Sequence, residues 1–200
     1  MSITALRLAL TGGIACGKST AAACFAKKSW LVISTDTLAH EALNAPAAID
    51  ALRTRHGNRI LNPGGTIDRA TLASIIFNNT TEKTWLENLI HPAVNHAWQT
   101  QLAENPSRNQ LVEIPLLFEK KLETHFDFSV CVHCAQPTQL ARMAARGLDT
   151  QQANARIQNQ LPLEEKMRRA NFCLFNEGHP RSLEQQITIL HARLTHATGQ

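Results

Sequence analysis

The chain has 200 residues, of which 44% are hydrophobic and 18% are charged, and its formal net charge at pH 7 is +4. This length allows one domain with small insertions and a substantial core. No apolar run approaches the roughly 20 residues of a membrane span. The basic residues are scattered, which argues against a nucleic-acid-binding protein. The start of the chain has the pattern of a buried strand and not of a signal peptide, so we expect a cytoplasmic protein.

The first predicted elements form a β-α-β unit. Residues Leu6–Thr11 have the pattern of a short buried strand, the alanine-rich segment Ser19–Lys28 predicts a helix, and Trp30–Ser34 predicts a second strand. Between the first strand and the helix, Gly12 to Ser19 reads Gly-Gly-Ile-Ala-Cys-Gly-Lys-Ser and fits G-x-x-x-x-G-K-[ST], the pattern of a phosphate-binding loop.

This loop predicts nucleotide binding for physical reasons. Its glycines let successive backbone N–H groups point at a polyphosphate, and the helix that follows adds the partial positive charge of its N-terminus. Lys18 can reach the β- and γ-phosphates, and Ser19 can ligate Mg²⁺. We therefore expect ATP to be held by the loop residues, which are Gly12, Gly13, Ile14, Ala15, Cys16, Gly17, Lys18, Ser19 and Thr20.

The remaining elements alternate between helical stretches and short strands. A long helical stretch from about 46 to 107 separates the second and third strands, with a new helix expected to begin at Pro92. The predicted helices after the second strand cover 35–43, 68–77, 82–89, 92–102, 137–145 and 183–195, and the later strands cover 110–114, 128–133 and 172–175.

This alternation predicts an α/β fold with a parallel sheet flanked by helices. We expect a single phosphate-loop kinase domain with its core at about 1–45 and 108–200. The stretch at about 46–107 is interpreted as a helical substrate-binding insert, and the segment at about 138–170 as a helical lid.

Two groups outside the loop are candidates for phosphoryl-transfer chemistry. Asp36 follows the second strand at the carboxyl edge of the sheet, where ligands of open α/β sheets bind, so it can accept a hydroxyl proton; capping the next helix is the alternative. Arg142 and Arg146 are spaced i and i+4 on a predicted helix and can clamp phosphates from a closing lid; a solvated basic face is the alternative.

The cysteines leave two interpretations open. Cys131 and Cys134 form a C-x-x-C pair, but zinc would need a second ligand pair, and the strand pattern favours packing of Cys131 as a small apolar residue. Cys16 lies within the phosphate loop, where its backbone alone is needed; a reactive thiol next to a helix N-terminus is the alternative.

The chain resembles the dephospho-CoA kinases, which phosphorylate the ribose 3′-hydroxyl of dephospho-coenzyme A in the last step of coenzyme A biosynthesis. The resemblance follows motifs in order along the whole chain: 10–20 around the loop, Asp36-Thr-Leu-Ala-His40, Gly65-Thr-Ile-Asp-Arg69, Leu89-Ile-His91-Pro92, Ile114-Pro-Leu-Leu-Phe-Glu119, Thr138-Gln-Leu-Ala-Arg142-Met-Ala-Ala-Arg146 and Asn176-Glu-Gly178.

The resemblance implies a role for each matched position, with ATP, Mg²⁺ and dephospho-CoA as the ligands. Asp36 falls on the family's catalytic aspartate, and Lys18, Arg142 and Arg146 would act on the phosphates. The acceptor side would be lined by Arg69, His91, Pro115 and Leu117; for His91, packing at a helix start is the alternative, and Glu119 can simply anchor its loop.

Five positions depart from the family pattern. Ser34 replaces the first aspartate of the family's Asp-Ala-Asp motif, and we expect a lower affinity for Mg²⁺ as a result. Ala15 and Cys16 replace Gly-Ser, and alanine is acceptable there only if its φ angle is negative. His133 and Asn171 stand where acidic residues are common. We expect these changes to tune the enzyme without changing its activity.

Overall fold

The structure, a computed structural model, describes residues 5–77 and 79–197. It divides into two compact units: Met1–Ser34 with Asn105–Gln200, and Thr35–Glu104. The second unit begins at Thr35, whereas the insert was expected from about residue 46. The first helix of this unit packs on its longest helix, which accounts for the earlier boundary.

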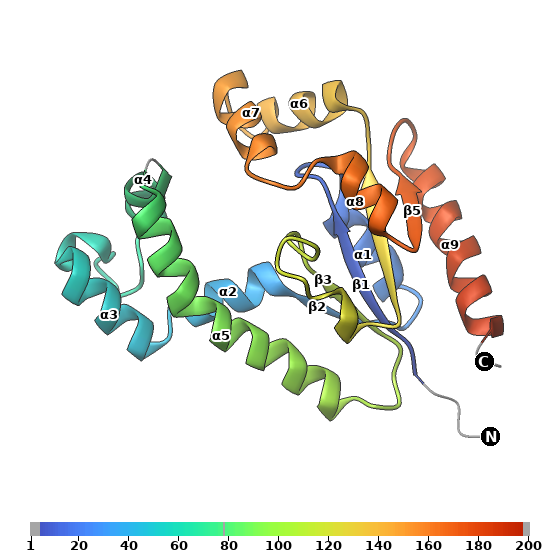
Figure 1. Ribbon diagram of the computed structural model, residues 1–200, viewed down its shortest axis with the longest axis horizontal. Helices are drawn as coiled ribbons and strands as arrows, with labels where there is room; N and C mark the ends of the chain where they lie inside the picture. Colours follow the sequence, from blue (N-terminus) through green and yellow to red (C-terminus); the bar gives the residue numbers. More distant parts are fainter. Residues whose placement is uncertain (1–4, 78, 198–200) are drawn as a thin grey trace. The chain divides into compact units, whose positions relative to one another are not determined.

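The first unit is built on a five-stranded parallel sheet with the order β2-β3-β1-β4-β5 (Figure 1). All five predicted strands are present, and so is the predicted parallel sheet. Strand β1 is central, with Leu10 in register with Glu113 of β3 and Val130 of β4. The strands are β1 Arg7–Gly12, β2 Leu31–Ser34, β3 Gln110–Glu113, β4 Phe128–His133 and β5 Phe172–Phe175.

Helices cover both faces of this sheet. Leu8 and Leu10 of β1 share an apolar cluster with side chains of α1 and α9, such as Phe25. Thr11 follows Leu10, so its side chain points to the other face, where α8 packs on β1 and β4. The helices of this unit are α1 Lys18–Ala26, α6 Gln136–Ala144, α7 Thr150–Gln158, α8 Leu163–Arg169 and α9 Pro180–Ala197.

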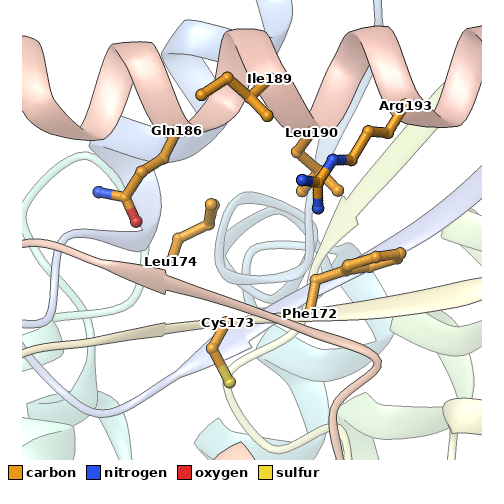
Figure 2. A pocket seen from close by; sticks show the side chains of 7 residues that line it. All are labelled: Phe172, Cys173, Leu174, Gln186, Ile189, Leu190 and Arg193. Atoms are coloured by element: carbon orange, nitrogen blue, oxygen red, sulfur yellow. The ribbon is translucent and has the colours of Figure 1, made fainter.

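The exposed edge strand β5 is partly protected by α9. Gln186 of α9 accepts a hydrogen bond from the Phe175 N–H (2.9 Å) and donates one to the Phe175 carbonyl (2.8 Å), which occupies backbone groups that could otherwise pair with another strand. Beside this contact, a groove between β5 and α9 is lined by Phe172 of β5 and Arg193 of α9, among others (Figure 2). The groove contains none of the predicted site residues.

The second unit is helical and has its own core. Its helices are α2 Thr35–Leu43, α3 Pro46–His56, α4 Arg69–Phe77 and α5 Thr80–Glu104, with a short 3₁₀ helix at Asn58–Ile60. Leu52 and Ile60 are fully buried in this core. Arg55 of α3 makes two hydrogen bonds with the Glu82 carboxylate of α5, at 2.7 and 2.8 Å, and its guanidinium lies 4.5 Å from the ring centre of Trp85.

One prediction in this unit is wrong. The sequence predicts a helix ending near residue 89 and a new one beginning at Pro92, but α5 runs through Pro92 without interruption. A proline inside a helix removes one backbone hydrogen bond and costs about 3 kcal/mol. Leu86 before Pro92 and Val94, Trp98 and Leu102 after it are all buried, and this burial on both sides outweighs the cost.

Within the described ranges, none of the helices has the length and apolar character needed to cross a membrane.

Candidate functional site

The phosphate loop connects β1 to α1, as its pattern requires. Ala15 has φ +58° and Gly17 has φ +94°, and left-handed residues alternating with right-handed ones turn successive N–H groups into an anion-binding nest. Gly12 has φ +143°, and a Cβ atom there would lie 2.1 Å from the Val132 carbonyl oxygen of β4. The loop therefore has the backbone geometry of a polyphosphate site, and glycine is required where it passes β4.

The condition placed on Ala15 is not met. A negative φ was expected to be necessary for alanine here, yet the residue adopts the left-handed conformation at +58°. Because the nest geometry needs this conformation, the loop imposes it on alanine, at a cost of about 1–2 kcal/mol.

Three side chains from distant parts of the chain contact the carbonyls of the loop. Gln139 of α6 donates from Nε2 to the Ile14 carbonyl at 2.8 Å. Arg142 of α6 donates from Nη1 to the Ala15 carbonyl at 3.2 Å. Asn176, after β5, donates from Nδ2 to the Cys16 carbonyl at 2.8 Å. Three consecutive loop carbonyls thus each accept a side-chain hydrogen bond.

Three polar side chains follow the loop in the first turn of α1. The Lys18 ammonium is 3.1 Å from the Gly13 carbonyl oxygen and 3.4 Å from that of Gly12, over the loop. Ser19 and Thr20 are exposed in the first turn of α1. In the described ranges no cluster of three His, Cys, Asp or Glu side chains could hold a metal ion. Ser19 has a hydroxyl that could ligate a Mg²⁺ ion bound to nucleotide phosphates.

The predicted arginine pair is not on one helical face. Helix α6 ends at Ala144, and Arg146 lies in the turn that follows, closed by the Arg146 N–H to the Met143 carbonyl (3.0 Å). Gly147, with φ +81°, continues this turn, and its N–H donates to the Ala144 carbonyl at 2.9 Å. Arg142 is half-buried and also donates to the Asn176 carbonyl at 3.0 Å, whereas Arg146 is exposed.

The cysteines of this region are buried and free. Cys16 is 0% exposed and its Sγ lies 3.6 Å from Sγ of Cys134, and this burial argues against the alternative of a reactive loop thiol. Cys131 is fully buried in β4, as the packing interpretation expects, and burial raises the pKa of its thiol to about 12. Burial likewise raises the pKa of the Cys134 thiol to about 12.

The segment after β3 is anchored by a lysine that the sequence analysis missed. Lys166 of α8 is fully buried and donates to the Pro115 carbonyl and to Oε1 of Glu119, both at 2.8 Å. Glu119 Oε1 also accepts from the Leu161 N–H at 2.9 Å, so this residue anchors its loop. The Leu117 side chain is 0% exposed; contrary to expectation, it is not available to a substrate.

In the second unit, Asp36 and Arg69 are both exposed. Asp36 lies in the first turn of α2, inside the helix and not at its N-cap position. Arg69 begins α4 and lines a pocket of about 340 Å³ together with His40 of α2 and Asn44, which follows that helix. His91 is half-buried in the middle of α5 and does not start a helix.

Asp68 fixes the start of α4. Its carboxylate accepts hydrogen bonds from the Thr71 hydroxyl at 2.7 Å and the Ala70 N–H at 3.0 Å. The bonds from Thr71 are the main reason why the pKa of the Asp68 carboxyl is lowered. Arg69, the next residue, therefore lies at the start of a helix whose first turn is capped by Asp68.

The two unusual residues at the β4 and β5 ends have local partners. The Asn171 side-chain oxygen accepts from the Ser129 N–H at 2.8 Å and from its hydroxyl at 3.0 Å, so it supplies the acceptor that an aspartate would offer. His133 lies beside Phe175, with ring centres 5.2 Å apart and the ring planes tilted by 42°, and burial lowers the pKa of its imidazole.

The sequence comparisons agree with this geometry. Residues 6–181 match a family model described as dephospho-CoA kinase. The dephospho-CoA kinase of Thermosynechococcus vestitus is 38% identical over 185 residues, covering 91% of each chain. Among solved structures, a Thermus thermophilus protein has a TM-score of 0.81 and 31% identity, and Campylobacter jejuni dephospho-CoA kinase has a TM-score of 0.72 and 28% identity; both alignments cover 96% of this chain and 98% of the other. The chain belongs to the dephospho-CoA kinase family.

Proposed function

We propose that this protein transfers the γ-phosphoryl group of ATP to the ribose 3′-hydroxyl of dephospho-CoA, giving coenzyme A and ADP. The observation that carries the proposal is the extent of the family match, which includes the whole second unit as well as the phosphate loop. A phosphate loop alone is shared by kinases, ATPases and switches.

On the donor side, the loop N–H groups and Lys18 bind the ATP phosphates, and Ser19 provides the protein ligand for Mg²⁺. When bound, the ion neutralises charge on the phosphate oxygens. Arg142, which donates to the loop carbonyl at Ala15, and the exposed Arg146 add positive charge for the transferring group. Such charge stabilises the loose transition state of phosphoryl transfer.

On the acceptor side, Asp36 accepts the proton of the attacking 3′-hydroxyl while the new O–P bond forms and the bond between the γ-phosphorus and the bridging oxygen breaks. Its exposure on the first turn of α2 leaves the carboxylate open to a substrate. The pocket with Arg69 and His40 suits the anionic diphosphate of dephospho-CoA. The family resemblance implies His91 and Pro115 as further acceptor-side residues. We also propose a cytoplasmic location, which fits five free thiols.

A coupled assay of ADP release tests the proposal. Dephospho-CoA should support turnover, while adenosine, AMP and shikimate should support little or none. Turnover of shikimate or AMP without turnover of dephospho-CoA would instead identify another small-molecule kinase. ATP binding without transfer to any acceptor would identify a nucleotide-binding regulator.

A further inference from the structure

We propose that Gln139 and Asn176 are positioning residues that hold the phosphate loop in its anion-binding conformation before the nucleotide arrives. The proposal rests on the function above for the identity of the nucleotide, and it assigns a role to two amides that the phosphate-loop motif does not contain.

The first argument comes from the hydrogen bonds of the loop backbone. Gly13 O accepts from the Cys16 N–H at 3.3 Å, and Gly17 O accepts from the Ala21 N–H at 3.0 Å. Between them, the carbonyls of residues 14, 15 and 16 each accept from a side chain, and none of them accepts from a backbone N–H of the described residues. A loop without regular structure depends on such external donors to keep one conformation.

The second argument is that the two amides lie close to two glycines of the loop. A Cβ atom at Gly13 would lie 2.6 Å from Nε2 of Gln139, and one at Gly17 would lie 2.0 Å from Nδ2 of Asn176. Both distances are too short for non-bonded atoms. Gly13 and Gly17 therefore make room for these two side chains, in addition to any close approach of phosphate.

The third argument is that the strained residue, Ala15, lies within the segment 14–16, whose carbonyls accept the side-chain hydrogen bonds. Ala15 has φ +58°, and its carbonyl is held by Arg142, whose other nitrogen holds the Asn176 carbonyl. Gln139 is only 4% exposed, so removing its donor leaves the Ile14 carbonyl without that partner in a poorly hydrated site. If the loop relaxes, the fraction of molecules able to bind phosphate falls, and the apparent affinity falls with it.

The test compares two buried glutamines that each donate to a backbone carbonyl. Gln139→Met keeps the size of the side chain but removes the donor to Ile14. The matched control is Gln110→Met, because Gln110 is 1% exposed and donates to the Asn105 carbonyl at 2.6 Å, outside the phosphate loop. For both variants, calorimetric titration gives the Kd for Mg·ATP and for dephospho-CoA, and melting gives Tm.

We expect Gln139→Met to weaken Mg·ATP binding by about 5- to 30-fold, the range for losing a buried hydrogen bond. Its Kd for dephospho-CoA should stay within about twofold of the wild-type value. Gln110→Met should lower Tm but keep the wild-type Kd for Mg·ATP. A folded Gln139→Met protein with wild-type affinity for Mg·ATP, or an equal loss of both ligands, would overturn the proposal.

A second pair keeps the test decisive if Gln139→Met fails to fold. Asn176 is half-buried, and Asn176→Ala removes the donor to Cys16, whereas Asn171→Ala removes an amide that contacts Ser129 and not the loop. Amide hydrogen exchange of residues 13–18 should accelerate in Asn176→Ala and stay unchanged in Asn171→Ala. Equal exchange in both variants contradicts the proposal. Failure of the wild type to phosphorylate dephospho-CoA would affect only the proposed function, because the Kd for Mg·ATP and the amide exchange of the loop are both measured without an acceptor.

Discussion

Lys166 and Glu119 form an ion pair inside the first unit, with 2.8 Å between Nζ and Oε1 and a lysine side chain that is 0% exposed. The pair joins α8 to the loop that follows β3, and the same ammonium donates to the Pro115 carbonyl. A buried ion pair contributes little over an apolar pair of the same shape, but removing one partner leaves the other charge uncompensated.

Replacing Lys166 by methionine should therefore lower the free energy of unfolding by about 3 kcal/mol. Denaturant titration measures this change. The control is Lys27→Met, because Lys27 lies 3.9 Å from Glu184 with both side chains more than half exposed, and exposed pairs contribute little. Equal stability of the two variants would show that the buried pair is not a structural anchor.

Asp36→Asn should separate binding from transfer. The variant keeps the shape and the helix but cannot accept a proton, so the turnover number should fall by about 10²- to 10⁴-fold while the Kd for ATP is unchanged. Glu41→Gln alters an exposed carboxyl on the same helix and should turn over normally. Near-normal transfer by Asp36→Asn in the ADP-release assay would leave Asp36 only a structural role in the first turn of α2.

Ala15→Gly should stabilise the protein, although glycine is usually the more destabilising residue. The left-handed conformation at φ +58° costs alanine about 1 kcal/mol and costs glycine almost nothing. We expect an increase in Tm, measured by calorimetry. Ala144→Gly, at the end of α6, is the control and should lower Tm, since its residue is helical. A lower Tm for Ala15→Gly would argue against the left-handed loop.

The thiols should differ sharply in reactivity. Cys173 is exposed and Cys24 is half-buried, whereas Cys16, Cys131 and Cys134 are buried. The pKa of Cys131 and of Cys134, each about 12, leaves almost no thiolate at neutral pH. Timed labelling with a thiol reagent, followed by mass spectrometry, should modify Cys173 first, and the buried three only after unfolding. Early modification of Cys16 in the folded protein would contradict its placement.

The stability of the second unit should fall at acidic pH because of Glu82. Its hydrogen bonds with Arg55 lower the pKa of the carboxyl below its ordinary value of 4.5. A lowered folded-state pKa contributes stability that is complete above 4.5 and is lost as the pH falls through the folded-state pKa. Unfolding measured over this range should give a flatter pH profile for Glu82→Gln than for the wild type. Identical slopes would show that the pair does not persist in solution.

The sequence predicted most of the fold because local patterns and the main packing agree. The strands at 110–113 and 128–133 are short apolar runs between turn signals, and the loop motif at Gly12 requires a strand before it and a helix after it. The exceptions were decided by packing: α5 continues through Pro92 because apolar residues on both sides of the proline are buried, and α6 stops before Arg146.

The site was predicted less completely. Lys18 and Asp36 come from motifs contained in short segments, so their place at the carboxyl ends of β1 and β2 follows from chain order. Gln139 and Lys166 contact positions 125 and 51 residues away, respectively. Gln139 lies in a matched segment, Thr138 to Arg142, but a lone amide in a helix carries no signal of its target. A lysine such as Lys166 is expected at the surface by composition alone.

The sequence by itself determined the parallel sheet, the phosphate loop and the family, because these depend on residue spacing along neighbouring stretches of chain. Only the tertiary structure decided which side chains hold the loop in its anion-binding form. Ala15 is left-handed, and the carbonyls at 14 to 16 are bound by Gln139, Arg142 and Asn176. Those contacts join parts of the chain far apart in sequence, and a hydrogen bond between them exists only after the strands have brought α6 and the β5 end beside the loop.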